Sequence, residues 1–246
     1  MRKARFLGYP IDALTMNETL EIVEEAITLN KQIHHTVVNA GKIVLMKTDK
    51  KLEKSVVNAD IINADGQAIV WAANLLGHNL PERVSGIDLM ERLVKRSFEK
   101  RYKCFFFGAT EEVVTKLVNI YKIQYSEDII AGYRNGYFEK EDEEKIALQI
   151  AESGADMLFV AITSPKKEIF LNTYKNNLQN VNFIMGVGGS FDVIAGKLKR
   201  APLWMQNFGL EWLYRISQEP KRMWKRYLVG NTKFIYLVLR EYFRNK

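Results

Sequence analysis

Side chains able to do acid–base or phosphate chemistry stand at the ends of short apolar runs in this chain. Asp65 and Gly66 directly follow the short, mostly apolar run IINA at 61–64 and precede a stretch with helical spacing. A carboxylate between a buried strand and a helix could accept a proton from an incoming hydroxyl group. Aspartate is also a common helix N-cap, so the spacing alone leaves both roles open for Asp65.

A glycine turn supplies a second candidate site. Gly186, Gly188 and Gly189 follow the apolar residues 183–185, and helical spacing resumes at Phe191. A strand, a tight turn and a helix start leave unpaired backbone N–H groups beside the positive end of the helix dipole, which suits a diphosphate. Glycines in such turns also serve backbone geometry alone. The spacing is not G-x-G-x-x-G, so it does not predict a dinucleotide site.

Three further runs end in polar or glycine residues, namely Thr36 with Asn39, Gly108, and the segment TSPKKE at 163–168. In that last segment, Lys166 and Lys167 fall in the first turn of a predicted helix, where the helix dipole disfavours cations. Such a local conflict is expected where lysines meet an anion. Ordinary surface lysines are the alternative.

Other reaction classes lack their motifs. The sequence has no Walker A loop, no G-x-S-x-G motif and no Cys/His pair, so it does not predict an NTPase or a hydrolase. His34, His35 and His78 lack metal-ligand spacing, and no D-x-D motif is present to hold a divalent ion. We therefore expect no metal and no cofactor. The single cysteine, Cys104, lies in an apolar run and is expected to pack in the core.

Short apolar runs alternate with amphipathic stretches through most of the chain, after a short extended piece expected at residues 6–9. This alternation predicts an α/β fold with a mostly parallel, Rossmann-like sheet and helices on both faces. Ligands of such sheets bind outside the carboxyl ends of the strands. No segment approaches the roughly 20 apolar residues that cross a bilayer, so we expect a cytoplasmic protein that at most lies on a membrane surface.

The strand-like runs stop after Arg200. Helical spacing follows, with Pro220 and Gly230 as breakers between the segments 203–217, 221–229 and 232–244. We predict an α/β core over residues 1–196 and a helical appendage over residues 197–246.

The appendage carries the positive charge of the chain. It holds 12 of the 36 Lys and Arg residues and 3 of the 29 Asp and Glu residues, a net charge of +9, which leaves −2 for the remainder. Aromatic residues are interleaved with these cations. This pattern fits an anionic membrane surface, and it also fits single-stranded nucleic acid. Packing of the aromatic side chains on the sheet is the third alternative.

With these residues laid out, the chain resembles the WecG/TagA/CpsF family of bacterial glycosyltransferases. The resemblance covers nearly the whole length and rests on six motifs in order, NADGQAIVWAANLLG, ERVSGIDLMERL, FFFGAT, TSPKKE, GVGGSFDVIAGKLKRAP and EWLYRISQEPKRMWKRY. It implies an inverting, metal-independent transfer of N-acetylmannosamine from a UDP donor to N-acetylglucosamine on a polyprenyl diphosphate, at the inner membrane face. Members that resemble TagA build the linkage unit of wall teichoic acid in this way.

The resemblance also implies roles for particular residues. Asp65 matches the aspartate proposed as the base that deprotonates the acceptor hydroxyl, and Arg83 could hold a phosphate bidentately. The remaining implied contacts are Asn39 with Thr36 in the same pocket, Gly188, Gly189, Asp192 and Tyr137 toward the donor, and Arg215, Arg222 and Lys225 or Arg226 from the appendage over the diphosphates. The family usually reads PKQE where this chain has Lys167. A lysine has no acceptor atom, which puts a sugar contact at Lys167 and the exact donor in question.

Two alternatives follow. The nearer is the same fold with another donor, such as UDP-N-acetylmannosaminuronic acid or UDP-glucose. The other is a nucleic-acid-binding module built on the basic aromatic appendage, although this would leave the polar strand ends unexplained; our prediction includes no nucleic acid. The stripe Ile69, Ala72, Ala73 and Leu76 would serve the core or a subunit contact equally, so a homo-oligomer stays open.

Overall fold

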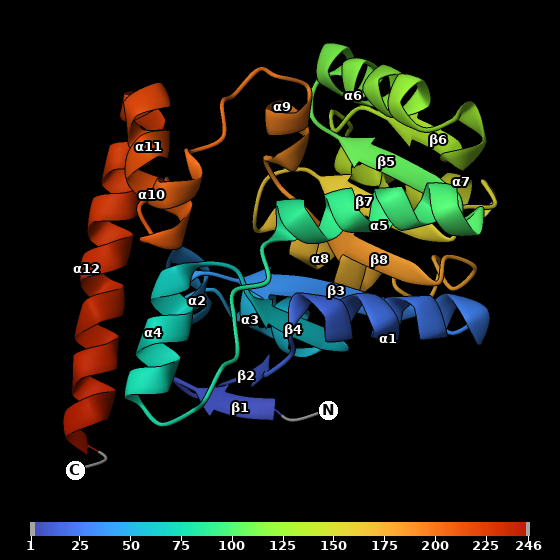
Figure 1. Ribbon diagram of the computed structural model, residues 1–246. Helices are drawn as coiled ribbons and strands as arrows, with labels where there is room; N and C mark the ends of the chain where they lie inside the picture. The colour runs from blue at the N-terminus through green and yellow to red at the C-terminus, as the bar shows by residue number, and fades with distance from the viewer. Residues whose placement is uncertain (1–2, 245–246) are drawn as a thin grey trace.

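Six parallel strands form the main sheet of the protein (Figure 1). The structure is a computed structural model that describes residues 3–244, apart from the side chains of residues 222, 223, 225 and 226. Across the sheet the order is β4 (Ile61–Ala64), β3 (Ile33–Val38), β8 (Phe183–Gly186), β7 (Met157–Ala161), β5 (Cys104–Gly108) and β6 (Ile130–Arg134). All neighbouring pairs are parallel, so every carboxyl end lies along one edge. The predicted α/β class is confirmed.

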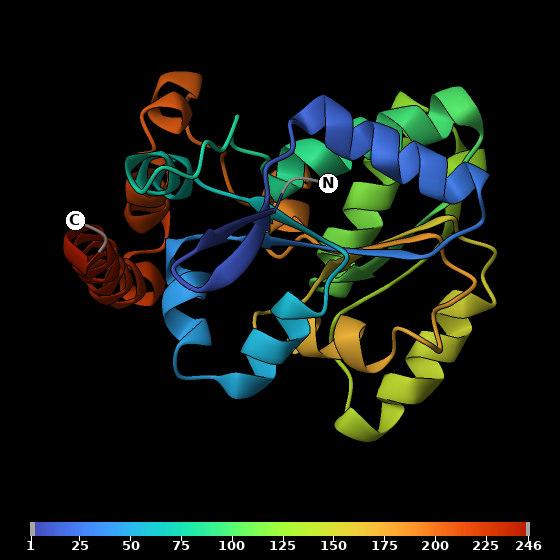
Figure 2. The same cartoon turned by 90° about the horizontal axis from the view of Figure 1, so that it is seen from below.

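Helices cover both faces of this sheet (Figure 2). One layer contains α1 (Met16–Thr28), α5 (Gly86–Lys100), α6 (Glu111–Gln124) and α9 (Ser190–Ile194). The other contains α3 (Lys50–Val57), α7 (Glu143–Ala151) and α8 (Lys166–Thr173), and single 3₁₀ turns lie at Glu127–Ile129 and Lys140–Asp142. Side chains along β5 point alternately to the two faces of the sheet. Phe106 packs in the first helix layer, and Phe105 and Phe107 pack in the second.

The N-terminus forms a hairpin of β1 (Lys3–Phe6) and β2 (Tyr9–Asp12). The expected extended piece at residues 6–9 is therefore wrong. Leu7 and Gly8 have φ values of 49° and 90° and reverse the chain between the two strands. The Asp12 carboxylate accepts a hydrogen bond from the Ile62 backbone N–H at 2.8 Å, which fixes the hairpin to the edge of the main sheet.

The C-terminal segment forms α10 (Leu203–Asn207), α11 (Glu211–Gln218) and α12 (Pro220–Arg244), which stand beside α2 (Ala40–Met46) and α4 (Gln67–Leu75) (Figure 1). The predicted break at Gly230 is wrong, because α12 continues through it. A Cβ at Gly230 would lie 3.8 Å from Gly41 Cα, so the glycine lets α12 pass close to the start of α2. The break falls instead at Gly209, whose φ is 65°.

The second half of α12 is part of the protein interior. Phe234 and Val238 are buried in the same apolar cluster as Phe6, and the Phe6 and Phe234 rings lie 6.1 Å apart. The predicted boundary between an α/β core (residues 1–196) and a helical appendage (residues 197–246) stays a prediction. In the part of the chain that the structure describes, no helix is apolar over a length that would cross a bilayer.

Candidate active site

The C-terminal helices cover the carboxyl ends of β4, β3 and β8. The loop between α10 and α11 meets the first residue of α4, because a Cβ at Gly209 would lie 3.3 Å from Gln67 Cβ. α12 passes Gly41, which follows β3. Arg215 of α11 reaches the turn after β8, because a Cβ at Gly189 would lie 3.2 Å from Arg215 Nη2. The three helices thus form a roof over the edge where ligands of such sheets bind.

Asp65 is a partly buried carboxylate immediately after β4. Its backbone N–H donates to Val38 O at 2.8 Å, which holds it beside the end of β3. The N-cap position of α4 is occupied by Gly66, whose φ is 143°. Asp65 therefore lies one residue before the cap, and helix capping does not account for its carboxylate.

Four charged groups from α2, α11 and the loop before α5 act on Asp65. Burial and then the nearby Glu211 carboxylate raise the pKa of Asp65 from 3.8 to about 6, although Arg83, Lys42 and Arg215 act in the opposite direction. A base works best when its pKa lies near the working pH. The environment therefore gives Asp65 the acidity that a general base needs at neutral pH.

Arg83 joins the core to the C-terminal helices. Its guanidinium donates to Glu211 Oε2 at 3.1 Å and to Gln206 Oε1 at 3.5 Å, and it lies 3.7 Å from the Asp88 carboxylate. The neighbouring Val84 N–H donates to Ala64 O at 2.9 Å, which places Arg83 close to Asp65. A guanidinium has five donor hydrogens, so these contacts leave room for a phosphate.

A buried ion cluster lies at the ends of β3 and β8. Lys42 Nζ and Lys167 Nζ approach the same oxygen, Glu168 Oε1, at 2.7 and 2.8 Å, and Lys42 also donates to Val37 O at 2.6 Å. Burial opposes ionisation of Glu168, but the two lysines outweigh it and lower the pKa of that carboxyl below its usual range. Two cations and one anion leave one positive charge at the strand ends, which suits an anionic ligand.

The glycine turn makes room for these cations. The Lys167 side chain passes over it, since a Cβ at Gly186 would lie 3.0 Å from Lys167 Cδ and one at Gly188 would lie 3.9 Å from Lys167 Nζ. The Arg215 guanidinium covers Gly189 from the other side. α9, which follows the turn, has only five residues. The positive field there thus comes mainly from side chains, and less from the helix dipole that the sequence suggested.

Thr36 lies on β3, and Asn39 is the residue directly after that strand. Asn39 is the N-cap of α2, and its Oδ1 accepts from the Lys42 backbone N–H at 3.0 Å. A Cβ at Gly66 would lie 3.9 Å from Asn39 Cβ, so Asn39 is a neighbour of the Asp65 loop. Thr36 is buried two residues before the end of β3.

Gly108 and Tyr137 lie farther along the sheet. The Gly136 N–H donates to Ala109 O at 2.8 Å, which brings Tyr137, itself 72% exposed, to the end of β5. That strand is four positions from β4, roughly 19 Å at 4.8 Å per strand. A Cβ at Gly108 would lie 2.4 Å from the Ala161 carbonyl carbon, so strand packing already requires this glycine.

Asp192 lies on α9 with its carboxylate 3.5 Å from Lys197 Nζ. Of the predicted appendage cations, Arg215 reaches the site. The side chains of Arg222, Lys225 and Arg226 lie outside what the structure describes.

Sequence reasoning missed Lys42, Glu168 and Glu211. Lys42 was detectable by the same argument that singled out Lys166 and Lys167, because it too lies in the first turn of a helix after a strand. Glu168 and Glu211 gave no such signal, since Lys42, which completes the Glu168 cluster, and Arg83, which bonds to Glu211, are distant in the sequence. Lys166 is exposed, so only the second lysine of that pair joins the cluster.

A parallel α/β sheet with a carboxylate and several cations at one edge suits the activation of a hydroxyl group next to an anionic leaving group. The comparisons give the family. Residues 4–246 match the sequence model of the family described as "Glycosyl transferase WecG/TagA/CpsF family". The chain therefore belongs to that family of glycosyltransferases.

Two relatives carry a more specific name. The chain is 36% identical to a protein of Bacillus spizizenii over 190 residues, which cover 77% of this chain and 72% of the relative. It is also 36% identical to a protein of Bacillus subtilis over 184 residues, covering 75% and 70%. Both are named N-acetylglucosaminyldiphosphoundecaprenol N-acetyl-beta-D-mannosaminyltransferase. The nucleic-acid alternative gains no support from these matches.

Proposed function

We propose that this glycosyltransferase moves N-acetylmannosamine from its UDP donor to N-acetylglucosaminyl-diphosphoundecaprenol. The names of the two Bacillus relatives support the acceptor and the transferred sugar. The observation that carries the proposal is the partly buried Asp65 carboxylate, with a pKa near 6, set among cations at the strand ends.

In the proposed mechanism, the acceptor hydroxyl attacks the anomeric carbon while Asp65 takes its proton. A bond forms between the acceptor oxygen and the anomeric carbon, and the bond from that carbon to the β-phosphate oxygen breaks. UDP leaves with the electron pair. Attack from the face opposite UDP inverts the anomeric configuration.

The leaving diphosphate needs positive charge, which the Lys42–Lys167–Glu168 cluster and Arg215 supply in this proposal. Fixed cations aimed at developing negative charge stabilise the transition state without reorganisation. The reaction would then not depend on a divalent ion, and turnover should survive EDTA. A strict metal requirement would contradict this part of the mechanism.

The interior face of the cell membrane is the proposed location, because the acceptor carries a polyprenyl chain. The basic aromatic C-terminal helices would lie on the anionic surface, as their composition favours.

Turnover with a panel of UDP-sugars on a synthetic lipid-diphosphate N-acetylglucosamine tests the proposal. We expect UDP-N-acetylmannosamine to give the highest kcat/KM. Preference for UDP-N-acetylmannosaminuronic acid or UDP-glucose would assign another donor to the same site. No transfer from any donor would refute the proposed reaction.

A further inference from the structure

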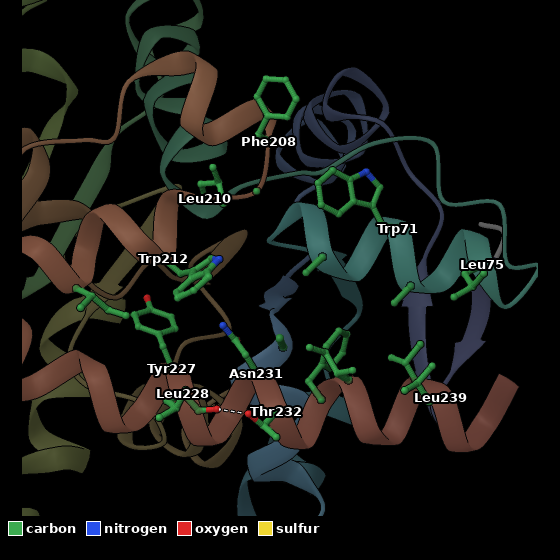
Figure 3. Close-up of a pocket in the computed structure, with 18 of the residues that line it drawn as sticks. Trp71, Leu75, Phe208, Leu210, Trp212, Tyr227, Leu228, Asn231, Thr232 and Leu239 are labelled. Carbon is green, nitrogen blue, oxygen red and sulfur yellow. Dashed lines mark hydrogen bonds between the residues drawn. The ribbon is translucent and has the colours of Figure 1, made fainter. Parts of the chain in front are cut away.

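A long apolar groove runs between α4 and the C-terminal helices (Figure 3). Its volume is about 730 Å³, within the range of ~300–1,000 Å³ that small-molecule sites occupy. α4 contributes residues at helical spacing, which are Ala68, Trp71, Ala72 and Leu75. Among these, Trp71 and Leu75 are 52% and 56% exposed, whereas Ala72 is buried.

α12 supplies the opposite wall. Its lining residues recur every three or four positions along one face: Trp224, Tyr227, Leu228, Asn231, Thr232, Phe234, Ile235, Val238 and Leu239. From Trp224 to Leu239 this face is about 22 Å long at 1.5 Å per residue. The Thr232 hydroxyl donates to Leu228 O at 2.8 Å, so one of the few polar groups on this wall is satisfied within the helix. The wall therefore suits a hydrocarbon more than a polar ligand.

Several large side chains that line this groove remain exposed to solvent in the folded protein. Trp71, Leu228 and Ile235 line it and are 52%, 62% and 57% exposed. Contiguous exposed apolar surface of this kind marks a site for a ligand, a membrane or another protein. The structure thus contains a large apolar surface that the catalytic chemistry alone does not use.

One end of the groove adjoins the candidate active site. Leu210 and Trp212 line the groove on either side of Glu211, which bonds to Arg83. Ala40, another lining residue, directly follows Asn39. The groove then leads away along α4 and α12 toward Leu75 and Leu239 (Figure 3). The cations at one end of the groove are complementary to a diphosphate head group, and the apolar groove beyond them is complementary to a hydrocarbon tail.

We infer that this groove binds the first part of the isoprenoid chain of a polyprenyl-diphosphate acceptor. The inference rests on the proposed function for the identity of the acceptor. The diphosphate would lie near Arg83 and Arg215, and the chain would run between α4 and α12 before it enters the membrane. The enzyme would then recognise its acceptor by the lipid as well as by the sugar.

Two neighbouring residues on α12 provide a matched test. Ile235 lines the groove, whereas Tyr236 is 63% exposed and does not line it. Ile235→Glu and Tyr236→Glu each remove an exposed apolar side chain and add the same charge to the same helix. They therefore affect adsorption to a membrane similarly and differ in their effect on the groove.

Kinetics with two acceptors separate the explanations. The acceptors carry the same diphosphate-N-acetylglucosamine head on either an undecaprenyl chain or a short alkyl chain. For Ile235→Glu we expect KM for the undecaprenyl acceptor to rise roughly ten- to hundredfold, as loss of one large apolar contact implies. KM for the short acceptor should stay unchanged in both variants, and with the undecaprenyl acceptor Tyr236→Glu should lose far less than Ile235→Glu.

Other outcomes would overturn the inference. Equal losses in both variants would assign the surface to bilayer contact alone. An equal loss of activity with both acceptors in Ile235→Glu, together with a change in oligomeric state on size-exclusion chromatography, would assign it to a second copy of the chain. A wild type indifferent to chain length would leave the groove without a role in acceptor binding.

A binding measurement keeps this test independent of the proposed reaction. Trp71, Trp212 and Trp224 are three of the four tryptophans of the chain, and all line the groove. Titration with undecaprenyl phosphate, which carries no sugar, should change their fluorescence saturably in the wild type and in Tyr236→Glu, and at least tenfold more weakly in Ile235→Glu. Saturable binding without any glycosyl transfer would refute the proposed function but not the groove. The absence of saturable binding would refute the groove.

Discussion

Replacing Asp65 with asparagine should make the folded protein more stable at neutral pH. The variant keeps the size of the side chain and removes its charge. Burial and Glu211 raise the pKa of Asp65 in the folded protein from 3.8 to about 6. A group with a raised pKa favours folding below its ordinary pKa, and this contribution is lost as the pH rises through the folded value. Ionised Asp65 therefore costs stability above pH 6.

The size of the effect follows from the two pKa values. A difference of about two pKa units corresponds to about 3 kcal/mol when Asp65 is fully ionised, near pH 7.5. At pH 4.5 the unfolded chain is largely ionised while the folded protein keeps its proton, and the cost is only about 1 kcal/mol. Asparagine carries no such cost. The stability gain of Asp65→Asn should thus increase by about 2 kcal/mol between these two pH values.

Urea unfolding of both proteins at pH 4.5 and pH 7.5 measures this difference, with the m-value as a check on two-state behaviour. A gain for Asp65→Asn that is equal at both pH values, or a loss at pH 7.5, would refute the raised pKa.

Three further predictions concern the cluster, the roof and the donor. Glu168→Gln should destabilise the protein by about 3–5 kcal/mol in urea unfolding, because it leaves two buried lysines without their anion; a cost below 1 kcal/mol would show that the lysines reach water. Phe234→Ala should cost about 3–5 kcal/mol, as for a buried aromatic in a shared core, whereas exposed Phe243→Ala should cost little; near-zero values for both would favour a separable appendage. Lys167→Gln should raise KM for the UDP donor about tenfold or more, since one charge-assisted phosphate contact is worth about 1.5–3 kcal/mol; an unchanged KM would remove Lys167 from the donor site.

The strand ends were the most predictable part of the structure. Runs such as residues 61–64 and 183–186 are mostly apolar over the length of one strand, and a parallel sheet brings their carboxyl ends to one edge whatever their order. Asp65, Asn39 and the glycine turn could therefore be grouped before the strand order was known. Strand order itself is not encoded locally, and it is what separates Gly108 and Tyr137 from Asp65.

Long-range packing accounts for what was missed. Gly230 reads as a helix breaker because glycine costs about 1 kcal/mol in a helix, yet close approach to Gly41 and burial of Phe234 outweigh that cost. Glu168, on α8 after β7, belongs to the site because β3 and β7 both flank β8, which brings Lys42 to it. The groove depends on α4 and α12, which lie some 150 residues apart, so neither amphipathic face alone predicts it.

The pH dependence of kcat/KM for sugar transfer tests the role of Asp65 most directly. For the wild type we predict a rising limb with an apparent pKa near 6, because the base acts only when ionised. Asp65→Asn should lower kcat by about 10²–10⁴-fold and abolish that limb, while UDP binding is retained. An Asp65→Asn variant with wild-type turnover, or one that keeps the same limb, would contradict the account.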